Sequence, residues 1–244
     1  MVAVCTKKPQ FCTLNQKGKK GLPGVASKSL PRGQGLGIPQ EQMNRYVTYL
    51  LMGPPGGGKG TQGKILGSVP RFFHFACGEV FRQLDTRTSI GKQFIEYSSK
   101  GELVPDDLTV ELWHQSIDSQ VVAARFKPDI DVLILDGIPR NVAQAELMVG
   151  MIDVKQIFHL SCANRQELVR RIRKRALKEN RLDDASEAVI QHRLELYEQE
   201  TKPILDHFAG RVTKVDASQP PVKVCYDILA KIWETRNGSL TFNA

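Results

Sequence analysis

The fold is decided by the stretch Tyr46-Val47-Thr48-Tyr49-Leu50-Leu51-Met52-Gly53-Pro54-Pro55-Gly56-Gly57-Gly58-Lys59-Gly60-Thr61. An apolar run typical of a strand leads directly into a glycine-rich loop that ends in a lysine. Glycines let backbone N–H groups close around phosphate oxygens, the next helix adds the positive end of its dipole, and Lys59 adds a charge. The stretch therefore predicts a loop for the phosphates of a nucleoside triphosphate, made of Gly56, Gly57, Gly58, Lys59, Gly60 and Thr61.

One residue departs from the common form of this loop, in which Ser or Thr directly follows the lysine and reaches Mg²⁺. Gly60 occupies that position and has no side chain to bind a metal, whereas Thr61 comes one residue later. Either the match is an accidental Gly/Pro-rich turn, or the loop is a variant that holds Mg²⁺ indirectly. The strand before it and the helix after it favour the variant.

Length and composition indicate an ordinary globular protein. The 244 residues suffice for one large domain or two small ones, and the apolar runs are far shorter than a membrane span. Five scattered cysteines without a CxxC pair argue against a zinc ribbon and against a disulfide framework. We therefore expect no membrane partner and a reducing, cytoplasmic location.

The net charge of +8 belongs almost entirely to the N-terminus. Residues 1–45 carry a net charge of +7, which leaves +1 for the other 199 residues. Because this segment has no apolar periodicity, we expect residues 1–44 to be a disordered basic tail, which need not be part of the native protein. A transit peptide and a weak polyanion-binding arm are alternatives, and Met43 is a candidate initiator. Residues 237–244 are expected to form a short C-terminal tail.

The remainder alternates strands with helices, which indicates βαβ units and a parallel sheet covered on both faces. The expected fold is a P-loop three-layer α/β/α domain over residues 45–236, with a five-stranded parallel sheet. The expected strands are residues 46–52, 72–76, 131–136, 154–160 and 211–216. Helical periodicity is found in residues 59–67, 78–100, 106–119, 140–151, 164–178, 186–209 and 221–235.

Chemistry-bearing residues follow these strands, where ligands bind in such folds. The apolar run 132–135 ends in Asp136, the expected Mg²⁺ carboxylate, acting directly or through water. Arg140 offers a bidentate fork for phosphate, and Arg82, about one turn into the helix after residue 76, could reach a second phosphate. Cys77 has no base or metal partner in the sequence, so we interpret it as a wall residue.

A third cluster is strongly basic and lies on one predicted helix and beyond it. It contains Arg170, Arg171, Arg173, Lys174 and Arg175, followed by Arg181 and Arg193. Such crowding is unfavourable without anions, and positioned cations neutralise charge during phosphoryl transfer. A solvated basic face or a nucleic-acid patch is the alternative interpretation. Arginines on a closing lid would also exclude water.

Together these motifs resemble the adenylate kinases, within the nucleoside monophosphate kinases. The resemblance covers roughly residues 45–235. Residues 53–61 resemble the family's GxPGxGKGT signature, which also has Gly after the lysine and holds Mg²⁺ largely through water. Residues 136–140 resemble its DGFPR signature, with Ile138 in place of Phe. The resemblance implies transfer of the ATP γ-phosphoryl group to AMP, giving two ADP, by a monomer with Mg²⁺ as cofactor.

The resemblance also implies roles for individual residues. Lys59 would hold the donor phosphates, Arg171 would lie against the donor base and Arg175 would reach the transferring phosphate. Arg181 and Arg193 would clamp phosphates from a short lid over about residues 175–184, a form that lacks the zinc-binding subdomain. The spacing before Arg193 is one residue longer than the family pattern. The monophosphate-binding part would span about residues 76–106, and the implied acceptor contacts are Cys77, Arg82, Val104, Gly137, Arg140, Gln144, Arg181 and Arg193.

The identity of the acceptor is the finer question. A Gln amide, here Gln144, can donate and accept along a purine edge, which suits adenine. Against adenine, Cys77-Gly78-Glu79 departs from the Thr-Gly-Asp of the adenylate kinases, and Asn141 resembles the UMP/CMP kinases. AMP is therefore the expected acceptor, with a UMP/CMP kinase and a catalytically silent nucleotide-binding module as alternatives.

Overall fold

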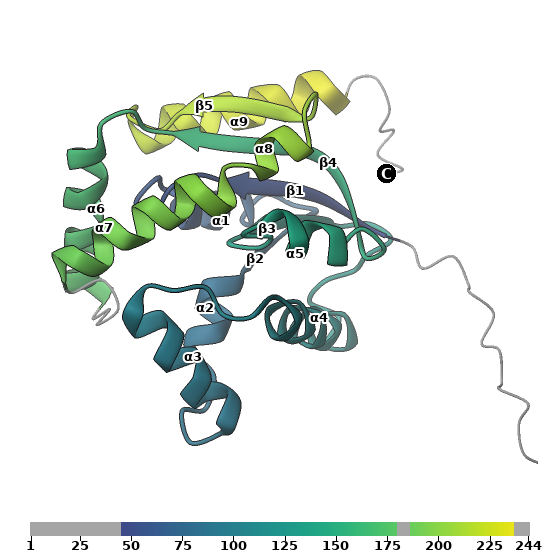
Figure 1. The fold of residues 1–244 in the computed structure, drawn as a ribbon. Coiled ribbons are helices and arrows are strands. Elements are labelled where there is room, and N and C mark those ends of the chain that lie inside the picture. Colours follow the sequence, from purple (N-terminus) through teal and green to yellow (C-terminus); the bar gives the residue numbers. More distant parts are fainter. Residues whose placement is uncertain (1–44, 180–185, 237–244) are drawn as a thin grey trace, which may run out of the picture. The chain divides into compact units, whose positions relative to one another are not determined.

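The computed structural model describes residues 45–179 and 186–236. One sheet contains β1 (Tyr46–Met52), β2 (Phe72–Ala76), β3 (Val132–Asp136), β4 (Ile152–Ser161) and β5 (Val212–Asp216). Every strand pair is parallel, and the spatial order is β2-β3-β1-β4-β5. The predicted five-stranded parallel sheet is confirmed, with a longer β4 than expected (Figure 1).

The helices of the described residues connect these strands and cover the sheet. They are α1 (Lys59–Leu66), α2 (Cys77–Arg82), α3 (Ser89–Lys100), α4 (Asp106–Val122), α5 (Val142–Leu147), α6 (Arg165–Glu179), α7 (Glu187–Leu196), the π-helix η2 (Tyr197–Thr201), α8 (Ile204–His207) and α9 (Pro221–Arg236). At the left of Figure 1, α6 and α7 run side by side, while α2 and α3 lie below the sheet. Within residues 45–179 and 186–236, no helix has both the length and the apolarity needed to span a membrane.

Side chains of β1 alternate between two cores, as the pleat of a strand requires. Leu50 and Met52 pack with Trp113 and other residues from α4, α2, α5 and α8. Leu51 faces the opposite way, in a cluster that contains residues of α1 and α9 such as Ile228. Because both faces of the sheet are buried under helices, the three-layer arrangement is confirmed, and the continuously apolar strands are explained.

Two helices that periodicity predicted as continuous are broken. The predicted helix 78–100 is divided into α2 and α3, because Asp85 forms a turn in which its Oδ1 accepts from Arg87 N at 2.9 Å. Thr88 then caps α3, with its Oγ1 accepting from Gly91 N at 3.0 Å. These short polar side chains compete with helical hydrogen bonds, so the helix stops and restarts.

The predicted helix 186–209 is also interrupted, by η2 and by Pro203. In η2 the N–H of Lys202 donates to the carbonyl of Tyr197, five residues earlier, at 2.9 Å. Pro203 has no N–H to continue the ladder, and α8 begins directly after it. Before this interruption, α7 packs against α6 through a separate cluster of Leu168, Ile172, Ile190 and Leu194.

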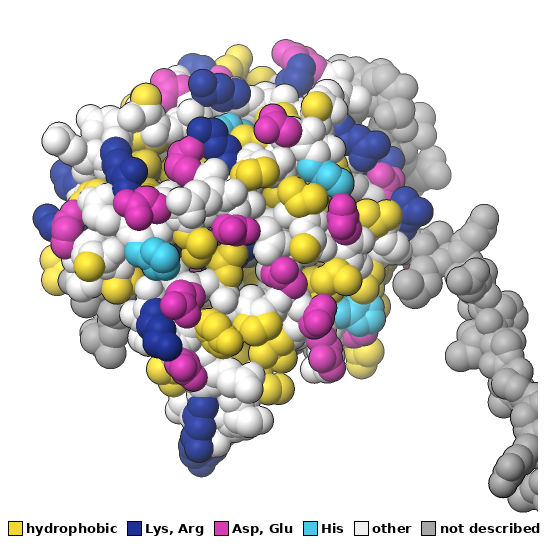
Figure 2. All heavy atoms as spheres, in the orientation of Figure 1, with side chains coloured by type: hydrophobic (Ala, Val, Ile, Leu, Met, Phe, Trp, Pro, Cys, Tyr) yellow, Lys and Arg dark blue, Asp and Glu magenta, His cyan; other side chains and the backbone are white. Residues whose placement is uncertain are grey.

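Sheet order brings the two signature motifs together. Leu51 of β1 pairs with Asp136 of β3, and Ala76 of β2 pairs with Asp136 from the other side. All three strands therefore end at the same edge, where the glycine-rich loop, Cys77 and the residues after Asp136 follow. Figure 2 shows basic and acidic side chains interspersed over one face of the described part of the chain.

Candidate active site

A cavity of about 970 Å³ opens at the carboxyl ends of the strands, at the upper end of the range for ligand sites. Ten basic and four acidic side chains of the described residues line it, so it attracts anions. The acidic ones are Glu79, Asp136, Glu167 and Glu179, and the basic ones are Lys59, Lys64, Arg82, Arg140, Arg170, Arg171, Lys174, Arg175, Lys178 and Arg193. The near-neutral domain thus concentrates its positive charge in this cavity.

The glycine-rich loop adopts a backbone that side chains would prevent. Gly56 and Gly58 have φ values of 78° and 91°, in the left-handed region. A Cβ on Gly56 would lie 2.8 Å from the carbonyl oxygen of Leu168 in α6. Gly58 precedes the first residue of α1, whose N–H groups face the loop. The loop therefore presents backbone donors and a helix N-terminus to the cavity.

Lys59 is the first residue of α1 and turns its side chain back over the loop. Its Nζ donates to the carbonyl oxygens of Gly53 at 2.6 Å and Pro54 at 3.2 Å. Burial is the main cause that lowers the pKa of Lys59 to about 8; Asp136 opposes the shift and neighbouring arginines add to it. Within the described part of the chain the ammonium group contacts carbonyl oxygens and no carboxylate, so its charge is available to an anion.

Asp136 lies at the end of β3 and is almost buried, with 8% of its surface exposed. A Cβ on Gly60 would lie 3.7 Å from its Oδ2, so the missing side chain leaves the carboxylate open toward the loop. His74 Nε2 lies 3.9 Å from the same oxygen. No group of three or more metal-ligating side chains occurs in the described residues. One hard oxygen ligand beside a phosphate loop fits Mg²⁺ that is held mainly by phosphates and water.

Arg82 and Arg140 stand on the side of the cavity formed by β2 and β3. Arg140 is anchored at two atoms: its Nε donates to Gly137 O at 3.0 Å, and its backbone N donates to Gln144 Oε1 at 2.8 Å. Gly137 has φ 84°, which turns the chain sharply after Asp136. The remaining guanidinium edge of Arg140 is left for a ligand in the cavity.

Three predicted acceptor contacts are buried and do not line this cavity. Cys77 is 1% exposed, Val104 is 9% exposed and Gln144 is fully buried. Burial raises the pKa of Cys77 to about 12, so its thiol stays neutral in the native protein, which does not suit a nucleophile. Gln144 directs its amide to Asp106 and to the backbone of Arg140.

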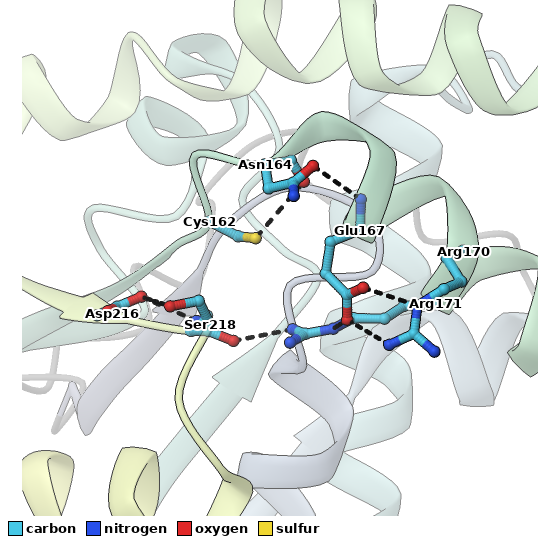
Figure 3. A network of polar contacts seen from close by, with 8 residues as sticks. Cys162, Asn164, Glu167, Arg170, Arg171, Asp216 and Ser218 are labelled. Atoms are coloured by element: carbon cyan, nitrogen blue, oxygen red, sulfur yellow. Dashed lines mark hydrogen bonds and ion pairs between the residues drawn. The ribbon is translucent and has the colours of Figure 1, made fainter.

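The opposite end of the cavity is formed by α6 and by the loop after β5 (Figure 3). Arg171 is held from two directions: Nε donates to Glu167 Oε1 and Nη1 donates to Ala217 O, each at 2.8 Å. Arg170 also bonds Glu167, and the two arginines lower the pKa of this carboxyl to about 2. The Arg171 guanidinium is thus fixed where a planar group can pack against it.

Helices α6, α7 and η2 close the remaining wall. Arg175 and Arg193 line it, and a Cβ on Gly101 would lie 2.9 Å from Arg193 Cγ, so the stem of Arg193 packs on that glycine. Tyr197 also lines the cavity and is paired with His159 of β4, with 2.9 Å between the hydroxyl and Nε2. Burial raises the pKa of Tyr197 and lowers that of His159, so both partners of this hydrogen bond are neutral, and the tautomer of His159 sets which of them donates.

Comparison with known proteins agrees with this geometry. The family model described as adenylate kinase matches residues 51–213. The chain is 34% identical over 172 residues to an adenylate kinase of Corynebacterium urealyticum, an alignment that covers 70% of this chain and 91% of the relative. It is 36% identical to that of Thermobifida fusca, over 71% of this chain and 92% of the relative. A Cyanothece sp. adenylate kinase is 37% identical over 73% of this chain and 91% of its own length.

The chain belongs to the adenylate kinase family. It is therefore a nucleoside monophosphate kinase, whose reaction takes ATP and AMP to ADP. The resemblance inferred from the phosphate loop and from residues 136–140 is confirmed. Kinase, transferase and nucleotide-binding activity follow from the same membership.

Most of the site residues expected for an adenylate kinase are brought to one cavity. Those that line it are Gly56, Gly57, Gly58, Lys59, Gly60, Thr61, Arg82, Asp136, Gly137, Arg140, Arg171, Arg175 and Arg193. Arg181 and half of the expected lid, residues 180–184, lie outside the described residues. The individual roles assigned to these residues stay predictions.

Sequence reasoning missed several residues of this adenylate kinase cavity. Glu167 was identifiable as an acidic residue four positions before Arg171, the spacing of helical ion pairs. Ala217 and Gln219 follow β5 at the same sheet edge as the other loops, a position that the strand pattern already indicated. Tyr197 and its partner His159 had no such signal, because only the π-helix places that ring on the wall.

Proposed function

We propose that the enzyme transfers the γ-phosphoryl group of ATP directly to the phosphate of AMP, with the residues of this cavity in the roles below. The observation that carries the proposal is one cavity that joins a phosphate loop, a carboxylate at its edge and six arginines from four separate elements or loops. Such a set matches a reaction in which charge is spread over the transferring group.

On the donor side, Lys59 and the backbone of residues 56–61 hold the ATP phosphates. Arg171 packs against the adenine base, supported by its two anchors, and Arg175 reaches the transferring phosphate. Asp136 holds Mg²⁺ through water, together with the donor phosphates. When bound, this ion neutralises phosphate charge.

On the acceptor side, Arg82 and Arg140 bind the phosphate of AMP, and Gly137 shapes the turn that carries Arg140. Cys77, Val104 and Gln144 lie beneath this surface and contact the base once the covering residues separate. Arg193 of α7, together with Arg181 of the lid, clamps the phosphates.

The chemistry that these residues supply is positioning and charge neutralisation. The acceptor oxygen is already anionic, so the transfer needs neither a general base nor a covalent enzyme intermediate. Arginines also keep water from the donor when the cavity closes, which favours transfer over hydrolysis.

The setting proposed for the enzyme is a monomer in the cytoplasm, acting without membrane or specific nucleic acid. Cys77, Cys162 and Cys225 are free thiols, which suits a reducing compartment. The tail of residues 1–44, the domain of residues 45–236 and the C-terminal tail 237–244 remain the proposed organisation. Gel filtration coupled to light scattering tests the monomer.

The decisive experiment measures phosphoryl transfer from ATP to AMP, CMP, UMP and GMP in turn. AMP should be the best acceptor, and Arg140→Ala should lower its kcat/KM by about a hundredfold or more. Arg87→Ala removes an exposed arginine outside the cavity and should change neither the preference for AMP nor its kcat/KM. A preference for CMP and UMP would favour the pyrimidine alternative, and an absence of transfer would favour the silent module.

A further inference from the structure

Asp106 joins two segments of the chain at the acceptor side. It is the first residue of α4, and its carboxylate accepts three hydrogen bonds from residues that follow β3. Gln144 Nε2 donates to Oδ1 at 2.8 Å, while Asn141 Nδ2 lies 2.9 Å from Oδ1 and 3.1 Å from Oδ2. Asn141 in turn caps α5, with Oδ1 accepting from Gln144 N at 2.8 Å. The carboxylate therefore ties the start of α4 to the turn that carries Arg140.

These contacts give the Gln144 amide a single orientation. The carboxylate of Asp106 is an acceptor only, so it requires the NH₂ group. The backbone N–H of Arg140 is a donor only, so it requires the oxygen, and Oε1 accepts from it at 2.8 Å. A flipped amide would lose both bonds and place donor against donor. One N–H and one lone pair of the amide remain for a ligand.

The positions of this remaining N–H donor and lone-pair acceptor decide which bases can form hydrogen bonds with the amide. Adenine and cytosine present an exocyclic amino donor beside a ring nitrogen acceptor, whereas hypoxanthine, guanine and uracil present an oxygen beside a ring N–H. An amide that can flip reads either pattern, but an amide held in one orientation reads one.

We propose that Asp106 is a positioning residue that holds Gln144 in one orientation and makes the acceptor site select amino bases over oxo bases. The inference rests on the proposed function, in which Gln144 contacts the acceptor base. Because Gln144 is fully buried in this structure, its orientation is set before the base arrives. The selection is independent of base size, so it acts on purines and pyrimidines alike.

The test compares kcat/KM for AMP, IMP, CMP and UMP in the full-length protein and in Asp106→Asn. The substitution keeps the shape of the side chain and replaces one acceptor oxygen with a donor. The ratios of AMP to IMP and of CMP to UMP should each fall by about tenfold, the effect of one hydrogen bond to a charged group. The KM for ATP and the ratio of AMP to CMP should stay unchanged.

Asp107→Asn is the matched control, because Asp107 is the next residue, is exposed, and carries the same charge in the same helical turn. It should leave all four acceptors unchanged, so an equal fall of the ratios in this variant would overturn the proposal. Unchanged ratios in folded Asp106→Asn would overturn it as well, while transfer to AMP itself would leave the proposed function standing. A wild-type protein without transfer to any acceptor would overturn both.

Two further measurements cover a variant that fails to fold. Asp106→Ser offers a smaller, rotatable hydroxyl and should lower the kcat/KM ratios of AMP to IMP and of CMP to UMP in the same way. In the wild-type protein, the side-chain amide protons of Gln144 should be protected from exchange in NMR spectra. Rapid exchange of these protons would contradict an anchored amide.

Discussion

Replacing Lys59 by Met tests two claims about the charged lysine of the loop: that it is needed for the reaction, and that its buried charge destabilises the folded protein. Methionine is of similar length and flexibility but has no charge and no donor. In the structure the ammonium group contacts two carbonyl oxygens and no carboxylate. We expect the variant to lose turnover by about a thousandfold, as for a group that stabilises charge in the transition state, and to become more stable.

The size of the stability change follows from the pKa of Lys59. Its ordinary value of 10.5 and the value of about 8 in the folded protein differ by the equivalent of about 3 kcal/mol, which disfavours the charged side chain on folding. Loss of two hydrogen bonds to carbonyl groups offsets about 1–2 kcal/mol of this gain. Lys59→Met should therefore be more stable by about 1–2 kcal/mol at pH 7, which raises Tm by about 2–8 °C.

The pH dependence distinguishes this explanation from a general gain in packing. Because the folded pKa lies below the unfolded one, the penalty is complete below about pH 8 and disappears as pH rises to 10.5. Wild-type stability should therefore approach that of the variant across this interval. Thermal melting from pH 6 to 10.5 measures it, with Lys92→Met on exposed α3 as the control. A variant less stable than wild type at pH 7, or one with nearly normal turnover, would refute the reasoning.

Three other outcomes are expected. The affinity for ATP should weaken as pH rises through about 8, because Lys59 of the enzyme without ATP loses its proton there. The KM for ATP, measured over a series of pH values, checks this, and a KM that stays constant up to pH 9 would contradict it. Gly63→Ala should destabilise the protein by about 1–3 kcal/mol, because its Cβ would lie 2.1 Å from Nε2 of the His74 side chain. Calorimetry of Gly63→Ala alone and with His74→Ala should show the double variant partly rescued, whereas additive losses would argue against a steric cause. Cys77 should resist iodoacetamide at pH 8 in the native protein, because it is buried and protonated; peptide mass spectrometry would reveal any labelling before unfolding.

Much of the fold was predictable because its signals are local. Continuous apolar runs marked β1 and β3, and they became strands buried on both faces. Helical periodicity predicted that most helices exist, but it did not predict the residues at which they begin and end. It failed at Asp85 and at Pro203, where side-chain hydrogen bonds and a missing N–H interrupt patterns that remain periodic in apolar residues.

The candidate site was also predictable in part. Lys59, Asp136 and Arg140 were identifiable because each stands at the end of a strand or in the loop that follows one, within a motif whose chemistry needs that residue type. Glu167, Ala217 and Tyr197 were missed because their place on the cavity wall depends on how α6, the loop after β5 and η2 approach one another. Such long-range contacts leave no periodic trace in the chain.

By itself, the sequence determined the phosphate loop, its unusual Gly60 and the class of reaction, because glycine, lysine and aspartate at these spacings constrain local backbone and charge. Only the tertiary structure decided that β3 lies beside β1, which brings Asp136 to within reach of Gly60. It also decided that Gln144 is enclosed and oriented by Asp106, 38 residues earlier in the chain. The physical reason is that hydrogen-bond partners so distant in sequence meet only after the sheet has assembled.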